Sequence, residues 1–565
     1  MQSKRWNAGR LALWLLPLGF LLAFYFFPLG KIAALSLSKW RQNGLTGWDW
    51  GLVGRTAGFT FYQAVLSTLL TLVVGMPAAY LFSRFRFRGK GFLRVASTLP
   101  FILPTVVVAA AFNALIGPHG WLNQGLMAAF QLAQPPIVIQ NSLAAILLAH
   151  VFYNTSIVIR VVSTAWEGVD LRLENAARTL GASPARVFRQ VTLPLIRPAL
   201  ISAFLLVFLF DFTSFGVILM LGGPQFSTLE VEIYIQTMQF LNLPLAGLLS
   251  LIQLVFCMGI TALIIGTGRS LSVPVMPRGN QENLRKPKKA PEKLFVFIMS
   301  FFLVFLLVMP LIALVGQALI VSDQNGWHLS LQYFRQLFVN SRQSIFYVPP
   351  IDALRNSLLY ALTASSLALG LGMLLAIATR ASRILSRVLN WLVLLPLGTS
   401  AVTFGLGLYL AFGTGRTALR WYPLLIPLAH ALIALPFVLN LIEPALNAIP
   451  ANLKWAARTL GASPRAVWRR VELPIIWRSA LTAFVYAFAI SLGEFGATSF
   501  LTRPDIPTLP IAVYRYLNLP GSLNYGQAMA MSVILLAVCA LSMFLVDRLQ
   551  LPGWSDNTRK VQPDA

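Results

Sequence analysis

Long apolar segments alternate with short polar ones along nearly the whole chain. Stretches such as LALWLLPLGFLLAFYFF (11–27) and LFVFIMSFFLVFLLVMPLIALV (294–315) have about the length that an α-helix needs to cross a bilayer. The pattern predicts an all-α, polytopic membrane protein. Its twelve expected transmembrane helices lie at residues 11–35, 59–83, 95–117, 142–165, 196–221, 245–267, 294–320, 355–379, 387–412, 422–446, 478–501 and 525–549.

Composition supports a membrane protein and argues against several other classes. Of the 565 residues, 57% are hydrophobic and 11% charged, less than half the charged share of a soluble domain. The net charge of +26 would suggest nucleic acid in a soluble protein, but here the basic residues gather in short loops. We therefore expect membrane lipid, and no nucleic acid, as a partner. The two cysteines, Cys257 and Cys539, lie inside apolar segments, and no metal-ligand or enzymatic constellation is visible.

The distribution of Lys and Arg predicts the orientation of the chain in the membrane. The segments 118–141 and 222–244 contain no Lys or Arg, whereas RFRFRGK (84–90) and residues 268–293 are strongly basic. Basic loops remain on the cytoplasmic side, so we expect both termini to be cytoplasmic. The apolar run after the N-terminus is expected to be a retained first helix rather than a cleaved signal peptide.

A 280-residue offset divides the chain into two similar halves. The nine residues AARTLGASP occur at 176–184 and again at 456–464, and His150 matches His430 across the same offset. Two six-helix halves of the same orientation imply a pseudo-twofold axis along the membrane normal. The expected boundaries are a first half at 1–267, a basic, proline-bearing cytoplasmic linker at 268–293 and a second half at 294–565.

The repeated segment has the residues of a compact helix–turn–helix. Gly181 and Gly461 suit the position just after a helix C-terminus, and the Ser-Pro pairs at 183–184 and 463–464 suit the start of a second helix. Pro194 and its counterpart Pro474 are expected to end that second helix. An internal packing elbow would explain one copy. Two copies with the same small residues, cap and proline favour a docking surface for two equivalent partners.

The segments NAARTLGASPARVFRQVTLP and WAARTLGASPRAVWRRVELP resemble the E-A-A-x3-G-x9-I-x-L-P loop of permeases from binding-protein-dependent ATP-binding-cassette importers. Over residues 55–265 and 350–550, the chain resembles the fused, double-length permeases of the ferric-iron and thiamine uptake group. The resemblance implies that the loops at about 172–194 and 451–474 are coupling helices on two copies of a cytoplasmic ATPase. The implied contact residues are Glu174, Ala176, Ala177, Leu180, Gly181, Pro194, Ala456, Ala457, Leu460, Gly461 and Pro474.

The resemblance also implies a mode of transport and a location. An extracytoplasmic solute-binding protein would deliver a small solute, ferric iron or thiamine, and the permease would move it inward by alternating access across a bacterial or archaeal cytoplasmic membrane. The sequence has no G-x-x-x-x-G-K-[ST] phosphate loop, so ATP hydrolysis is expected in a separate subunit and no cofactor on this chain. One departure stands out. The position of the motif's glutamate is held by Asn175 in one copy and Trp455 in the other.

Two acids lie within expected membrane helices. Asp211 aligns with Ser491 and Ser214 aligns with Glu494, so each half has one acid and one serine on a shared helix face, in exchanged order. Charges inside a span usually face the protein interior or a water-filled path, which suggests a polar lining of the route, for instance for a cation. An interhelical hydrogen bond is the structural alternative. An ion-gradient-driven carrier with these coupling acids is the alternative function, and the two histidines are expected to be packing groups.

Overall fold

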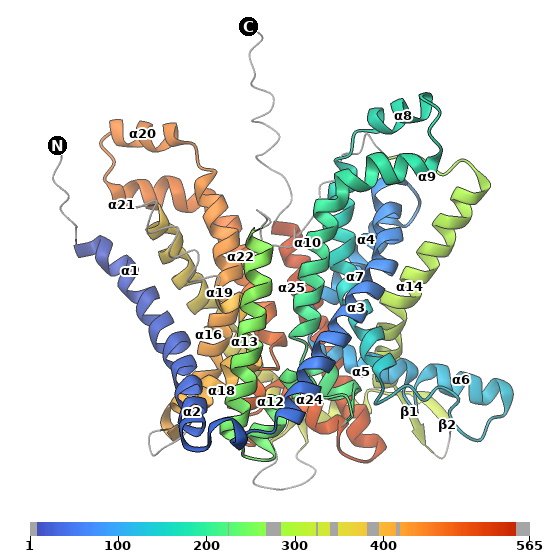
Figure 1. Cartoon of the computed structure of the whole chain (residues 1–565), viewed down its shortest axis with the longest axis horizontal. Coiled ribbons are helices and arrows are strands. Elements are labelled where there is room, and N and C mark those ends of the chain that lie inside the picture. Colours follow the sequence, from blue (N-terminus) through green and yellow to red (C-terminus); the bar gives the residue numbers. More distant parts are fainter. Residues whose placement is uncertain are drawn as a thin grey trace.

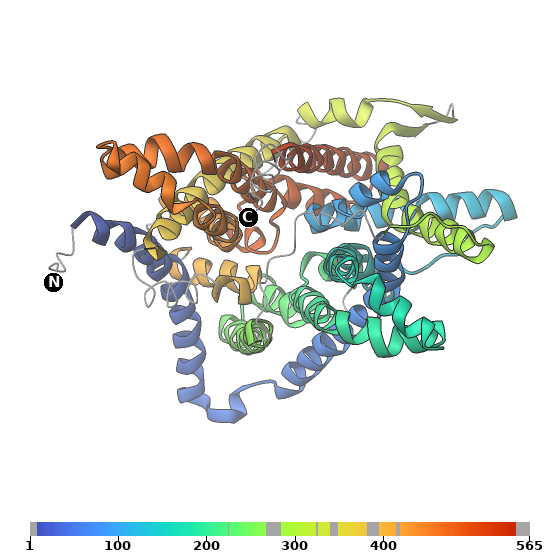
Figure 2. The ribbon, with the colours of Figure 1, turned by 90° about the horizontal axis from the view of Figure 1, so that it is seen from above.

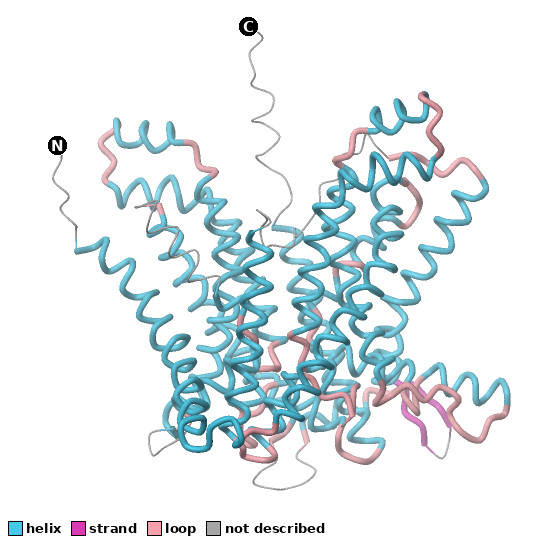
Figure 3. The backbone as a smooth tube through the Cα atoms, in the orientation of Figure 1, coloured by secondary structure: helices cyan, strands magenta, loops and turns pink. Residues whose placement is uncertain are grey.

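The computed structural model is almost entirely helical, with one short hairpin among the residues it describes (Figure 3). It describes residues 8–223, 225–266, 284–323, 326–339, 348–380, 395–413 and 418–549. Eleven helices in these ranges are long and apolar enough to span a membrane. Part of the twelfth expected span, at 387–412, lies outside the described residues, and its described end is a short apolar helix at Ala401–Phe412.

The helices of the first half begin with a pair joined by a π turn at Leu22–Phe26. They are α1 (Ala8–Leu21), α2 (Phe27–Asn43), α3 (Trp50–Arg84), α4 (Lys90–Ala96), α5 (Thr105–Ile116), α6 (Trp121–Phe130), α7 (Leu143–Glu167), α8 (Leu171–Thr179), α9 (Pro184–Val187), α10 (Leu193–Phe212), α11 (Gly216–Leu221), α12 (Leu229–Met238) and α13 (Leu243–Gly266). The span expected at 95–117 is broken between α4 and α5, where Pro100 and Pro104 remove backbone N–H donors.

The second half follows the same order after one long first helix. Its elements are α14 (Ala290–Leu319), β1 (Ile320–Asp323), β2 (Gly326–Leu329), α15 (Gln332–Arg335), α16 (Pro350–Thr379), α18 (Ala401–Phe412), α19 (Ala418–Asn447), α20 (Ala451–Thr459), α21 (Pro464–Val467), α22 (Leu473–Gly493), α23 (Thr498–Leu501), α24 (Leu509–Leu517) and α25 (Ser522–Leu549). The strands β1 and β2 form an antiparallel hairpin in which Ile320 pairs with Leu329.

The most buried spans are α7 and α19, one in each half. Each packs closely on the long helix before it, α7 on α3 and α19 on α16. A Cβ atom on Gly75 would lie 2.6 Å from Val158, and one on Gly372 would lie 2.6 Å from Val438. Since small residues let membrane helices approach closely, these two glycines permit the close packing of α3 on α7 and of α16 on α19.

The first helices of each half pack partly on the other half. Helix α1 packs on α16 and α2 packs on α18, both in the second half, while α14 packs on α5, α4 and α3 of the first half. Seen from above, α1 lies beside α16 and α14 lies beside the blue helices of the first half (Figure 2). Tyr25 contributes a hydrogen bond between its hydroxyl and that of Thr399, 2.9 Å apart. The two halves are therefore interlocked.

Candidate functional site: two surface loops and a central cavity

The repeated segments lie at the same end of the molecule, as Figure 1 shows for α8, α9, α20 and α21. We call residues 172–194 repeat loop 1 and residues 451–474 repeat loop 2. Gly181 and Gly461 have φ angles of +83° and +81°, the left-handed conformation expected after a helix C-terminus. The Ser183 hydroxyl accepts the N–H of Arg186 at 3.4 Å and caps α9, as the sequence predicts.

The prolines at the loop exits do not end the second helix, so that expectation is wrong. The π turns Phe188–Thr192 and Trp468–Glu472 join α9 to α10 and α21 to α22. Leu193 N–H bonds to the carbonyl of Phe188, five residues back. Pro194 has no N–H, so regular α-helical hydrogen bonding cannot continue through it, and the wider turn accommodates the gap.

The loop surfaces expose apolar side chains at matching positions. Leu180 and Leu460 are each 88% exposed, and Trp455 is 64% exposed. The remaining predicted contact residues are exposed or half-buried in both copies: Ala176, Ala177, Gly181, Pro194, Ala456, Ala457, Gly461 and Pro474. Single exposed leucines are ordinary on a protein surface, so what favours an interaction site is that the same leucine, cap and glycine recur in both copies.

Glu174 differs from the other predicted contact residues because its side chain is buried. It accepts hydrogen bonds from Arg84 and from the Thr192 hydroxyl, so it faces the interior of the loop. Nearby, the Lys90 ammonium donates to the carbonyls of Phe82 and Phe85 at the end of α3. Burial lowers the pKa of Lys90 to about 8.

A cavity of about 370 Å³ lies between the halves. Its lining includes Asp211 and Ser214 from the first half and Glu494 from the second. Ser491 is buried beside it and contacts His430 rather than lining the cavity. Aromatic rings form much of the wall: Phe101, Tyr153, Phe210, Phe215, Phe437, Tyr486 and Phe495. The cavity thus combines carboxylates with aromatic faces.

The two histidines connect the acids and serines of their own halves. Nδ1 of His150 lies 3.3 Å from Asp211 Oδ1, and its Nε2 lies 2.9 Å from the Ser214 hydroxyl. Asn154 donates to the same carboxylate at 2.6 Å. The sequence predicts a packing role for His150, and the match of His150 to His430 is the signal that points to this site.

In the second half the acid and the serine exchange places around the ring. Nδ1 of His430 lies 2.7 Å from the Ser491 hydroxyl, and Nε2 lies 3.1 Å from Glu494 Oε2. Glu494 also accepts the backbone N–H groups of Ala497 and Thr498. The sequence shows the acid and the serine in exchanged order. In the structure this means that Nδ1 contacts the acid in the first half and the serine in the second, and that Nε2 contacts the other residue of each pair.

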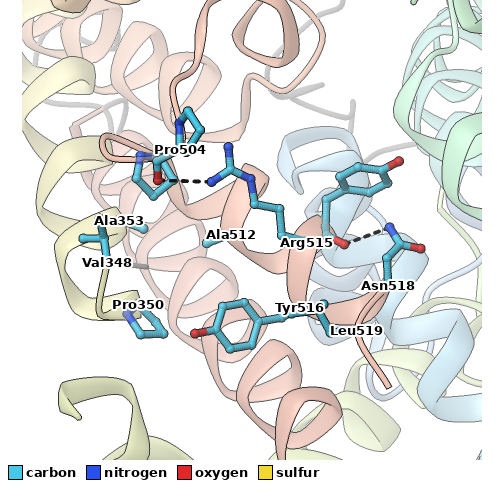
Figure 4. A pocket seen from close by; sticks show the side chains of 11 residues that line it. Val348, Pro350, Ala353, Pro504, Ala512, Arg515, Tyr516, Asn518 and Leu519 are labelled. Carbon is cyan, nitrogen blue, oxygen red and sulfur yellow. Dashed lines mark hydrogen bonds between the residues drawn. The ribbon is translucent and has the colours of Figure 1, made fainter. Parts of the chain in front are cut away.

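A second cavity, of about 440 Å³, lies at the end opposite the repeat loops, between the start of α16 and α24 (Figure 4). Arg515 is the charged residue of its lining and donates to the carbonyl of Pro504 at 3.4 Å. In neither cavity do three His, Cys, Asp or Glu side chains of the described residues gather as a metal-ligand group.

Comparison with known proteins identifies the class of transporter. Residues 71–276 and 368–553 each match the family described as binding-protein-dependent transport system inner membrane component. The thiamine transport system permease protein ThiP of Brucella abortus is 27% identical over 87% of both chains. That of Escherichia coli is 27% identical over 93% of this chain and 94% of its own. A probable ABC transporter permease protein, y4fN of Sinorhizobium fredii, is 27% identical over 80% of both chains.

Homologues of this kind are permease components, and ATP hydrolysis in such systems belongs to a separate subunit. The sequence-based interpretation as an importer permease is confirmed, and the alternative of an ion-gradient-driven carrier is not supported. With its two copies of the unit, the chain belongs to the family of binding-protein-dependent transport system inner membrane components, as the multi-pass permease subunit of an ATP-binding-cassette importer.

Proposed function

We propose that this permease imports thiamine. Two observations support this proposal. Relatives named as thiamine permeases are similar to this chain over most of their length, and the central cavity has suitable chemistry. Thiamine carries a cationic thiazolium ring and an aminopyrimidine ring. Carboxylates favour a cation, and aromatic faces attract cations and stack with flat rings. Ferric iron, the other expected substrate, has no comparable support from the named relatives.

The pathway in this proposal runs through the central cavity. Asp211, Ser214 and Glu494 line it, and Ser491 supports its wall through His430. An extracytoplasmic binding protein would deliver thiamine to the end of the molecule that carries α12 and α24. The cavity would then open alternately to the two sides of the membrane. In this proposal the chain consists of two halves, at 1–267 and 294–565, and both termini and the linker at 268–293 are cytoplasmic.

The repeat loops are the proposed docking sites for two copies of the ATPase. The observation that carries this proposal is the pair of exposed leucines, Leu180 and Leu460, which have the same backbone conformation at the ends of α8 and α20. Both helices lie at one end of the molecule (Figure 1). ATP can reorient the permease only if the ATPase pair contacts one conformation more favourably than the other. The permease itself would bind no cofactor, and ATP would act through its partner.

The test is ATPase binding by Leu180→Asp and Leu460→Asp permeases purified with their partner subunits. We expect each substitution to weaken ATPase recovery and ATP-driven thiamine uptake by about tenfold or more, because a charge would enter an apolar contact. Both leucines are exposed, so the free energy of unfolding should change by less than about 0.5 kcal/mol. Leu331→Asp, an exposed position after the hairpin, is the control. Undiminished ATPase recovery with both loop variants would exclude these loops as docking sites.

A further inference from the structure

Repeat loop 1 is tied to the end of α3, and repeat loop 2 to the end of α16, each through one carboxylate. In brace 1, which we define as Arg84, Glu174 and Thr192, the Arg84 guanidinium and the Thr192 hydroxyl both donate to Glu174 Oε1, the latter at 2.9 Å. The side chains of Arg84 and Glu174 are 5% and 10% exposed. Brace 1 thus joins the end of α3, helix α8 and the π turn before α10.

Brace 2, which we define as Arg380, Lys454 and Glu472, joins the corresponding three segments of the second half. Nη1 of Arg380, just after α16, lies 3.1 Å from Glu472 Oε1. Nζ of Lys454, in α20, lies 3.2 Å from the same oxygen. The carboxylate now comes from the π turn before α22 rather than from the first short helix.

The two braces are related by an exchange of positions. Across the 280-residue offset, Glu174 aligns with Lys454 and Thr192 aligns with Glu472. The acid has moved from one of these segments to the other, yet it still meets an arginine at the end of the long helix. Even a buried ion pair is weak evidence for stability, because desolvation offsets much of the attraction, so an arrangement rebuilt with different residues needs another explanation. Both braces hold the loop at a set position relative to the long helix.

The long helix leads from brace 1 to the central cavity. On α3, the Ser67 hydroxyl lies 2.9 Å from Nδ1 of His150. The next residue, Thr68, donates to Asp211 at 3.5 Å. The same helix packs on α7 through Gly75 and Val158. A displacement of repeat loop 1 that moves α3 would therefore reach the polar groups of the cavity through one rigid helix.

We propose that Glu174 and Glu472 are equivalent positioning residues that make each repeat loop move as one body with α3 or α16. The proposal rests on the proposed function, because it assigns to the braces the transmission of ATPase motion to the cavity. Glu174 then acts from inside the loop, whereas Leu180 and its neighbours contact the partner.

The test exchanges the two residues without changing composition. Glu174→Thr removes the carboxylate, Thr192→Glu adds a second one, and the double variant E174T/T192E places a single carboxylate where brace 2 has it. The permease is reconstituted in liposomes with its ATPase and binding protein, and ATP-dependent uptake of thiamine, ATPase rate and ATPase recovery are measured. K454E/E472K is the matched exchange in the second half.

We expect E174T to lower thiamine uptake per hydrolysed ATP by about tenfold, a coupling effect of ordinary size, while ATPase recovery stays unchanged. The double variant should recover uptake to within about threefold of the original chain, since residues in contact are strongly non-additive. Should E174T fail to accumulate in the membrane, Glu174→Gln takes its place in the comparison.

The proposal is overturned if the exchanged variant couples as poorly as E174T, or if E174T couples normally. Loss of ATPase recovery in E174T would also overturn it, because Glu174 would then be part of the docking surface. If the original chain itself shows no ATP-dependent uptake of thiamine, the proposed substrate fails. The braces can then still be judged from the ATPase rate of the reconstituted complex, compared with that of the ATPase alone.

Discussion

Single residues determine how the helices within each half contact one another. His150 contacts Asp211 and Ser214 at opposite ring nitrogens, and His430 contacts Glu494 and Ser491 in the same way. An acid can therefore change position without losing its histidine. Gly75 and Gly372 have a simpler role, since a Cβ on either would overlap a valine of the neighbouring helix. At this scale both halves have the same histidine and glycine, while the acid and the serine exchange places around the histidine.

Substitution of Gly75 tests the close approach of α3 and α7. A Cβ at this position would lie 2.6 Å from Val158, so Gly75→Ala should lower the free energy of unfolding by about 1–3 kcal/mol. Gly58→Ala in the same helix is the matched control, because nothing lies within 4 Å of its added Cβ. Equilibrium denaturation in detergent measures both variants. Equal stability of the two would show that the helices can separate at no cost.

At the scale of elements, the π turns before α10 and α22 set the direction of the repeat loops. Each turn precedes a proline, Pro194 or Pro474, that cannot donate a backbone hydrogen bond. Figure 1 shows α9 and α21 lying across the ends of α10 and α22. The bend therefore carries the exposed leucines away from the spans and onto the surface of the molecule.

Pro194→Ala should straighten this bend, because alanine supplies the missing N–H and allows regular α-helical bonding. We expect thiamine uptake per hydrolysed ATP to fall by about fivefold or more, an effect within the usual range of coupling between sites, while the thermal stability stays equal or rises. Pro198→Ala, inside α10, is the control for loss of a proline from the same helix. Uptake and ATPase rate are measured together, and normal coupling in P194A would contradict a role for the bend.

At the scale of the whole molecule, the first helices of each half contact the other half and hold the two together. Phe20, Leu21 and Tyr25 of α1 and the π turn belong to a buried cluster formed mainly by α16, α19 and α22. Reciprocally, α14 packs on α5 of the first half. The central cavity therefore lies between two units that cannot separate without breaking the apolar contacts of these helices.

The interlock predicts that a chain broken within residues 267–283 still assembles when both pieces are made together. Removal of residues 1–43 from the first piece should lower recovery of the second piece by about tenfold or more, because the contacts of α1 and α2 are lost. Affinity purification through a tag on one piece measures this recovery. Equal recovery with and without residues 1–43 would place the binding energy elsewhere between the halves.

The sequence by itself determined the class of fold, the duplication, both repeat loops and their caps. These features depend on local properties: apolar length, basic loops, and the glycine, serine and proline of AARTLGASP. The 280-residue offset also paired Asp211 with Ser491 and Ser214 with Glu494, but the expected shared helix face is wrong. Ser214 and Glu494 lie just after the ends of α10 and α22, where the helices break. The helix end predicted at Pro194 and Pro474 is wrong. The choice between a helix end and a π turn depends on whether neighbouring carbonyls find other partners, which local sequence does not specify.

Only the tertiary structure decided which side chains meet. Arg84 is 90 residues from Glu174, and Tyr25 is 374 residues from Thr399, so no periodicity relates them. The burial of Glu174 and the contact of each histidine with both an acid and a serine depend on helices brought together by packing. Likewise, nothing in the sequences of α1 and α14 predicts that they pack on the other half. Pairing across such distances is fixed by the fit of whole helices, which is a property of the assembled molecule.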